Sequence, residues 1–120
     1  MEQDKYIKLQ EKVCEKFFQE KDFVNLDSLI ALGKNFNPDK QINGLRHPRT
    51  ENLSGWYIWS GEDFNPEEYD FFKPIHTYHL VDYAAYIIKY LGLPAGNRFL
   101  IDKNGYEDIW FDENLLITSI

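Results

Sequence analysis

Hydrophobic residues recur at three- and four-residue intervals near the start of the chain. Tyr6, Leu9, Val13 and Phe17 follow this spacing, and charged residues fill the opposite side of the helical wheel. The pattern is typical of an amphipathic helix with one buried side, so it predicts a helix over residues 5–20. Cys14 lies at the edge of the apolar stripe, where we expect a packed thiol without a catalytic role.

The pattern changes after residue 24. Asn25 suits an N-cap and Gly33 suits the end of a helix, which predicts a short second helix between them. Residues 34–54 contain many Asn, Gly and Pro residues and predict a long irregular loop. This loop contains a local basic cluster, formed by Arg46, His47 and Arg49.

A strand is predicted over residues 55–61, because Trp56 to Trp59 are all strong β-formers. Alternation along a strand places Trp56 and Ile58 on one face and Tyr57 and Trp59 on the other. One face must meet the helices, so Trp59 is either a core residue or an exposed anchor. Residues 62–74 form an acidic loop rich in aromatic residues, and residues 75–78 predict a short strand.

Residues 79–91 show a second helical pattern, and Gly92 and Pro94 follow it as stop signals. Strands at 98–102 and 106–111 flank Asn104-Gly105, the strongest short hairpin signal. We expect Phe99 and Trp110 in the core of this hairpin. Residues 115–117 form a last short strand or a docked tail.

This order of elements predicts one α+β domain over residues 1–120, with a small antiparallel β-sheet covered by two main helices on one face. Residues 1–33 form the N-terminal helical region of this domain.

Composition narrows the range of functions. The chain has 20 acidic and 13 basic residues, a net charge of −7, and an aromatic content of 17%. An acidic surface disfavours DNA, RNA and anionic membranes as partners and suits a basic protein. The single cysteine excludes an internal disulfide. No apolar signal segment or membrane span is evident, so we expect a cytoplasmic protein that is a monomer or weak homodimer.

Evidence for enzymatic chemistry is weak. His76 and His79, with Asp82 as a third candidate, would share a face if helical and could then bind a metal. Pro74 favours an extended start, which places the two histidines apart, and capping or hydrogen bonding is the simpler interpretation. No nucleophile motif or phosphate-binding loop occurs, so we expect no enzyme, no metal and no cofactor. The tryptophans leave a small-ligand or carbohydrate-binding module as an alternative, and a metal-dependent hydrolase as a weaker one.

Two acidic segments, residues 62–70 and 107–113, are interleaved with aromatic residues. Carboxylates beside aromatics suit a basic partner, because charge speeds the encounter and aromatics anchor the contact. We therefore expect both segments to face the same side and to bind the partner, with the 34–54 loop as a rival surface. The candidate binding residues are Trp59, Glu62, Asp63, Glu67, Glu68, Tyr69, Asp70, Glu107, Asp108 and Asp112.

An ordered series of motifs resembles a bacterial family of immunity proteins of polymorphic toxin systems, the "immunity protein 33-like" family. The series runs through Gly55–Glu62, Asp70–His76, Tyr90–Gly96, Arg98–Ile101 and Gly105–Asp112, and the resemblance covers residues 44–117. It implies a non-enzymatic protein that binds a cognate toxin and blocks it, by occluding the toxin's active site. A nuclease-like toxin would be basic and would complement an acidic protein.

Overall fold

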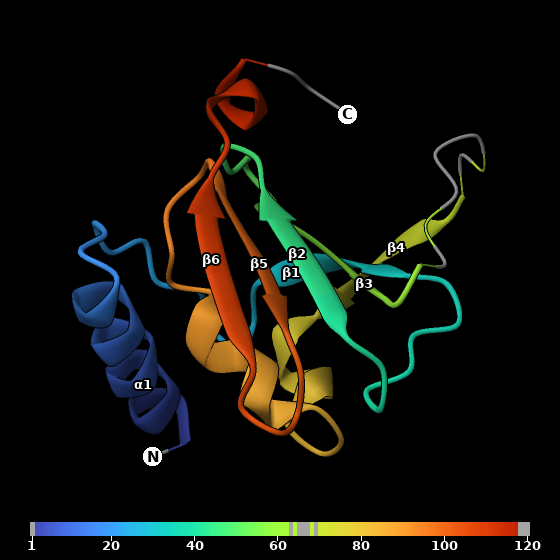
Figure 1. Ribbon diagram of the computed structural model, residues 1–120, viewed down its shortest axis with the longest axis horizontal. Helices are drawn as coiled ribbons and strands as arrows, with labels where there is room; N and C mark the ends of the chain where they lie inside the picture. The colour runs from blue at the N-terminus through green and yellow to red at the C-terminus, as the bar shows by residue number, and fades with distance from the viewer. Residues whose placement is uncertain (1, 63, 65–67, 69, 118–120) are drawn as a thin grey trace.

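Six strands form one mixed sheet in the computed structural model of the chain, which describes residues 2–62, 64, 68 and 70–117 (Figure 1). The spatial order is β4-β1-β3-β2-β5-β6, so β4 and β6 are the two edges. β1 and β3 pair in parallel, and the other neighbours are antiparallel. The strands are β1 (Leu29–Gly33), β2 (Ile42–Arg46), β3 (Leu53–Ser60), β4 (Phe72–His76), β5 (Asn97–Ile101) and β6 (Glu107–Phe111).

One face of the sheet packs against the helices. The α-helix α1 (Glu2–Lys16) and the 3₁₀ helices η1 (Thr77–Leu80) and η2 (Ala85–Tyr90) contribute to a single hydrophobic core with this face, while η3 (Glu113–Leu116) follows β6. The sheet contributes Ile30, Ile58 and Phe99 to this core, and all three are buried. The expected fold is therefore wrong in two respects: the sheet is six-stranded and mixed, and one α-helix rather than two covers it.

The predicted helix between Asn25 and Gly33 is instead β1. Leu29 to Leu32 form a continuous apolar run, which cannot by itself distinguish a buried strand from a helix. β1 lies between β4 and β3, where a strand buried on both sides needs such a run.

The second predicted helix is broken into η1 and η2. Ala84 lies between them with φ −152° and ψ 40°, which interrupts helical geometry. The apolar pattern was nevertheless a correct guide to burial, because Leu80, Ile87, Ile88 and Leu91 are all fully buried.

The predicted irregular loop contains a central strand, β2, which lies between β3 and β5. Gly44 is required in the middle of β2, since a Cβ atom there would lie 2.3 Å from Cζ of Phe99. A glycine within a strand is thus the mark of a closely packed ring and not of a turn.

The first helix and the last hairpin are confirmed. α1 begins at Glu2 and ends at Lys16, so it starts before and ends before the predicted 5–20, and Phe18 follows it with a left-handed φ of 57°. Cys14 is buried and donates its thiol hydrogen to the Gly92 carbonyl at 3.2 Å, as expected of a packed thiol. Burial raises the pKa of Cys14, which keeps the thiol protonated and unreactive. β5 and β6 pair across the turn at Asn104-Gly105.

Candidate binding surface on the edge strand β6

The side chains of β3 alternate between the two faces of the sheet as predicted. Trp56 and Ile58 lie in the core beneath the helices, whereas Trp59 and the half-buried Tyr57 belong to a second cluster on the opposite face. Trp59 is only 7% exposed and packs edge-on against Phe64, with ring centroids 5.0 Å apart. Of its two possible roles, Trp59 therefore has the structural one and is withdrawn as an exposed anchor.

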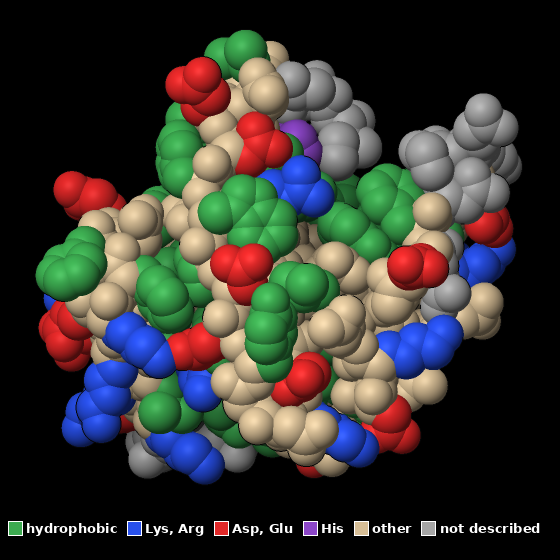
Figure 2. All heavy atoms as spheres, in the orientation of Figure 1, with side chains coloured by type: hydrophobic (Ala, Val, Ile, Leu, Met, Phe, Trp, Pro, Cys, Tyr) green, Lys and Arg blue, Asp and Glu red, His purple; other side chains and the backbone are tan. Residues whose placement is uncertain are grey.

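Exposed aromatic and acidic side chains gather instead on β6 and on the residues beside it, and we call residues 106–113 the β6 surface. Tyr106, Trp110 and Phe111 are 49%, 40% and 52% exposed. Figure 2 shows hydrophobic and acidic side chains interleaved over β5 and β6. Large exposed aromatics beside charge are typical of protein-binding anchors.

The exposure of Trp110 contradicts the expected core position. Register explains the difference: Phe99 is opposite Ile109, and Trp110 is opposite Arg98. Directly paired residues share a face, so Trp110 lies on the face opposite the helices. Tyr106 and Phe111 were missed as candidates, although the exposed end of a hairpin turn was a usable signal for Tyr106.

Arg98 organises the charges around Trp110. Its guanidinium lies 5.6 Å from the Trp110 ring centroid and 3.3 Å from a carboxylate oxygen of Asp112. Asp112 also accepts a hydrogen bond from the Asn114 N–H, which caps η3. Asp108 and Glu113 are exposed and form no ion pair within the described part of the chain, so their charges face solvent.

Glu107, although in the same segment, is engaged internally. Its carboxylate accepts hydrogen bonds from Lys16 Nζ and from the Tyr90 hydroxyl, the latter at 2.6 Å. Burial opposes ionisation of Glu107, but these two hydrogen bonds outweigh it and lower the pKa of the carboxyl group. Burial and the same contact raise the pKa of Tyr90. Glu107 therefore ties β6 to the helices, and we remove it from the candidate contact residues.

The other acidic segment lies elsewhere. It precedes β4, and four strands of the sheet separate β4 from β6, so the two acidic segments lie at opposite edges of the sheet. Glu68 and Asp70 lie 2.5 and 4.0 Å from Lys34 Nζ, which partly neutralises them, and Glu62 is exposed. Three further candidates, Asp63, Glu67 and Tyr69, lie outside the described residues.

The expected basic cluster is mostly internal. Arg46 is fully buried and donates hydrogen bonds to the carbonyls of Ser54, Leu91 and Leu93 at 2.9 to 3.1 Å. Desolvation lowers the pKa of Arg46 to about 10, so the group stays charged at neutral pH. Arg49 is exposed but paired with Asp22 at 2.6 Å, and His47 is buried. The rival surface therefore retains little free positive charge.

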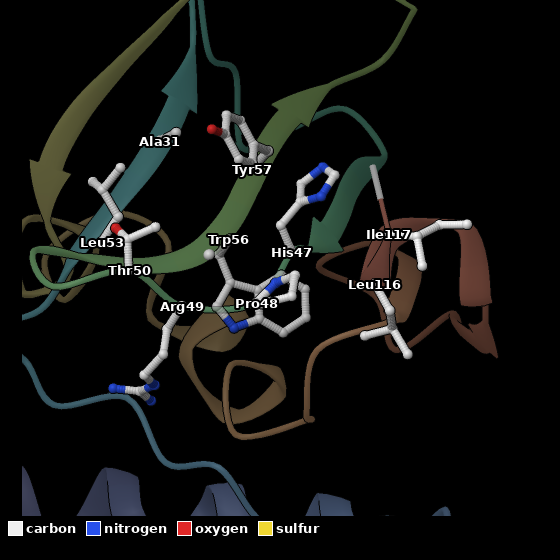
Figure 3. A pocket seen from close by; sticks show the side chains of 11 residues that line it. Ala31, His47, Pro48, Arg49, Thr50, Leu53, Trp56, Tyr57, Leu116 and Ile117 are labelled. Atoms are coloured by element: carbon white, nitrogen blue, oxygen red, sulfur yellow. The ribbon is translucent and has the colours of Figure 1, made fainter. Parts of the chain in front are cut away.

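A cavity of about 320 Å³ opens beside η3, on the face opposite the helices (Figure 3). Its lining is largely apolar and includes Leu53, Tyr57 and Ile117. The His47 ring also lines it, with Nδ1 3.1 Å from the Leu115 carbonyl oxygen. A carbonyl only accepts, so Nδ1 donates, and Nε2 is buried without a hydrogen-bond partner among the described residues.

The rings of His76 and His79 pack around the Tyr78 ring. Their ring centroids lie 6.2 Å apart, and the Tyr78 ring stacks 5.0 Å from His76 and 4.6 Å from His79. Among the residues that the structure describes, no three His, Cys, Asp or Glu side chains could hold a metal ion.

No described helix is both long and apolar enough to cross a membrane.

Comparison with known proteins identifies a family. No curated protein and no solved structure matches the chain significantly. A family model, the Imm33-like domain, matches residues 9–112, a range that starts well before the motifs at 44–117 and takes in the second half of α1. The chain therefore belongs to the Imm33-like domain family, a family of immunity proteins.

Proposed function

We propose that this chain is a non-enzymatic immunity protein that binds a cognate bacterial toxin and blocks its active site. Family membership supports the class of function. The β6 surface supports the place of binding, and the charge of −7 favours a basic toxin such as a nuclease. In this proposal the immunity protein acts inside the cell that makes the toxin, as a monomer.

The single observation that carries the proposal is Trp110 on an edge strand, exposed between carboxylates. A tryptophan buries a large area with little loss of conformational freedom, which makes it a strong anchor when a partner covers it. Asp108 and Glu113 lie on either side of Trp110 in sequence and their charges are free to act at long range. The proposal thus assigns affinity to Trp110 and encounter rate to the two carboxylates.

The test is a kinetic binding measurement with the toxin encoded beside this gene, at low and high salt. We expect the double variant Asp108→Asn, Glu113→Gln to slow association and to flatten its salt dependence. We expect Trp110→Ala to leave association nearly unchanged and to speed dissociation by about tenfold or more.

A matched control is the double variant Asp4→Asn, Glu20→Gln, which removes the same charge from the α1 region. It should change association much less, because electrostatic steering depends on charge near the contact. A toxin that binds all of these variants with wild-type kinetics would show that the β6 surface is not the contact. A toxin with no affinity for the wild-type protein would contradict the proposed function itself.

The cavity beside η3 supports one alternative, a small-ligand-binding module. Its lining is largely apolar and includes the rings of His47 and Tyr57. Small aromatic molecules such as indole and phenol suit such a lining, so we expect them to shift the NMR signals of Tyr57 and Ile117 if the alternative is correct. Saturable shifts that a His47→Phe variant loses would favour it over toxin binding.

A further inference from the structure

The outer edge of β6 presents a regular row of backbone groups. The Asp112 N–H donates to the Gly96 carbonyl, and the Asp102 N–H donates to the Tyr106 carbonyl. Even-numbered residues of β6 therefore face β5, because antiparallel strands alternate between inward and outward backbone groups. The N–H and C=O groups of Glu107, Ile109 and Phe111 consequently face away from β5, and no described residue hydrogen-bonds to them.

At the opposite edge of the sheet, the same alternation places a proline among the outward residues of β4. In β4 the Thr77 N–H donates to the Ser28 carbonyl and the Lys34 N–H donates to the Phe71 carbonyl, so odd-numbered residues face β1. Pro74 is the central outward residue of β4, and it has no N–H to donate. Proline on an edge strand is a common protection against strand pairing, and β6 has no proline.

The surroundings of β6 leave its edge accessible. β6 is the last strand in the order of the sheet, so no strand pairs with its outer side within the described part of the chain. Trp110 projects from one face of the strand and Phe111 from the other, so an added strand would find an apolar contact on both faces.

We propose that the toxin adds an extended segment to β6 as a seventh strand of the sheet, an inference that rests on the proposed function. Backbone hydrogen bonds to Glu107, Ile109 and Phe111 supply the pairing, and side chains set its specificity. Asp108 lies two residues from Trp110 on the same face of β6, so it selects a segment with Lys or Arg two positions from an apolar residue that packs against Trp110. Glu113 adds negative charge beyond the end of the strand. A second copy of this chain is a poor occupant, because it would bring the same carboxylates and a second charge of −7 to the edge.

Amide hydrogen exchange resolved by NMR tests this pairing directly. In the free protein, amides of Asp108 and Trp110 should be protected by β5, while those of Glu107, Ile109 and Phe111 exchange rapidly. Addition of the toxin should protect the three outward amides and thereby remove the alternation. If the toxin binds and these three amides still exchange at the free rate, strand addition is wrong while toxin binding stands.

A proline substitution provides the second test. Ile109→Pro removes the central outward N–H and leaves every β5 hydrogen bond of β6 in place, whereas Ile109→Ala shortens the same side chain and keeps the N–H. We expect Ile109→Pro to weaken toxin binding about tenfold relative to Ile109→Ala, with both variants checked for folding by thermal melting. Equal affinities would overturn the proposal. A concentration-dependent dimer of the wild-type protein alone, lost in Ile109→Pro, would show that a second copy is the occupant.

Discussion

The buried guanidinium of Arg46 lies against the carboxylate of Asp22, with Nη2 and Oδ2 3.3 Å apart, and this ion pair ties β2 to the segment that follows α1. The contact lacks hydrogen-bond geometry at Nη2, but Nη1 donates to the Asp22 carbonyl at 2.7 Å. The same side chain also bonds the carbonyls of Leu91 and Leu93 beyond η2. One arginine thus joins the sheet, the α1 linker and the end of the 3₁₀ helices.

Removal of Arg46 should therefore destabilise the whole fold. Arg46→Met leaves the Leu93 carbonyl without its donor, although the Leu91 carbonyl keeps a hydrogen bond from Trp56 Nε1 at 2.8 Å. It also leaves Asp22 without its buried partner, and we expect a loss of roughly 3–5 kcal/mol in the free energy of unfolding. Arg49→Met removes an exposed partner of the same Asp22 and should cost only about 0–1 kcal/mol. Urea denaturation of the two variants gives the comparison, and equal losses would contradict the role assigned to Arg46.

Phe99 and Trp110 should respond in opposite ways to truncation, although both belong to the last hairpin. Phe99 packs 5.2 Å from the Trp56 ring centroid and is 1% exposed, so Phe99→Ala should cost about 3–5 kcal/mol. Trp110→Ala should cost less than about 1.5 kcal/mol, because the ring is largely exposed. Thermal melting measures both, and a large fall in Tm for Trp110→Ala would place that ring in the core.

Gly44 should tolerate no side chain. A methyl group there would meet the Phe99 ring, so we expect Gly44→Ala to lower stability by about 1–3 kcal/mol. The double variant Gly44→Ala, Phe99→Leu should recover part of the loss caused by Gly44→Ala when compared with Phe99→Leu alone. Strictly additive losses in this double-mutant cycle would show that the ring does not cause the effect.

Glu107 should make stability depend on acid pH. Its pKa is lowered in the folded protein, so in the range between the folded value and the unfolded value of about 4.3 the unfolded chain binds more protons. The contribution is therefore complete above the unfolded pKa and is lost as pH falls through the folded one. Glu107→Gln should be less stable than wild type at pH 7, and the difference should shrink as the pH falls below the unfolded pKa. A difference that does not change with pH would contradict this account.

Local patterns predicted the elements whose neighbours in sequence are also their neighbours in space. The hairpin at Asn104-Gly105 pairs adjacent strands, and the stripe through Tyr6 and Val13 places α1 on the core, so both predictions needed only nearby residues. The alternation in β3 was correct for the same reason.

Predictions failed where distant residues decide the conformation. β1 is a strand because it pairs with β3 and β4, and Leu29 to Leu32 contain no information about those partners. Gly44 and Arg46 were interpreted as loop residues, yet a ring from β5 and carbonyls beyond η2 determine their positions. The arrangement of the candidate binding residues could not be predicted for the same reason. The acidic segments were visible in the sequence, but the strand order of the folded sheet is what places them at opposite edges.

The proline in β4 limits how far assembly can proceed. A sheet with two open edges can grow without end, since each added molecule exposes a new edge to the next. With Pro74 on one side and an open strand only on the other, each molecule can end a growing sheet but cannot extend it. The expected stoichiometry is therefore one partner per chain, and the protein should resist fibril formation at high concentration.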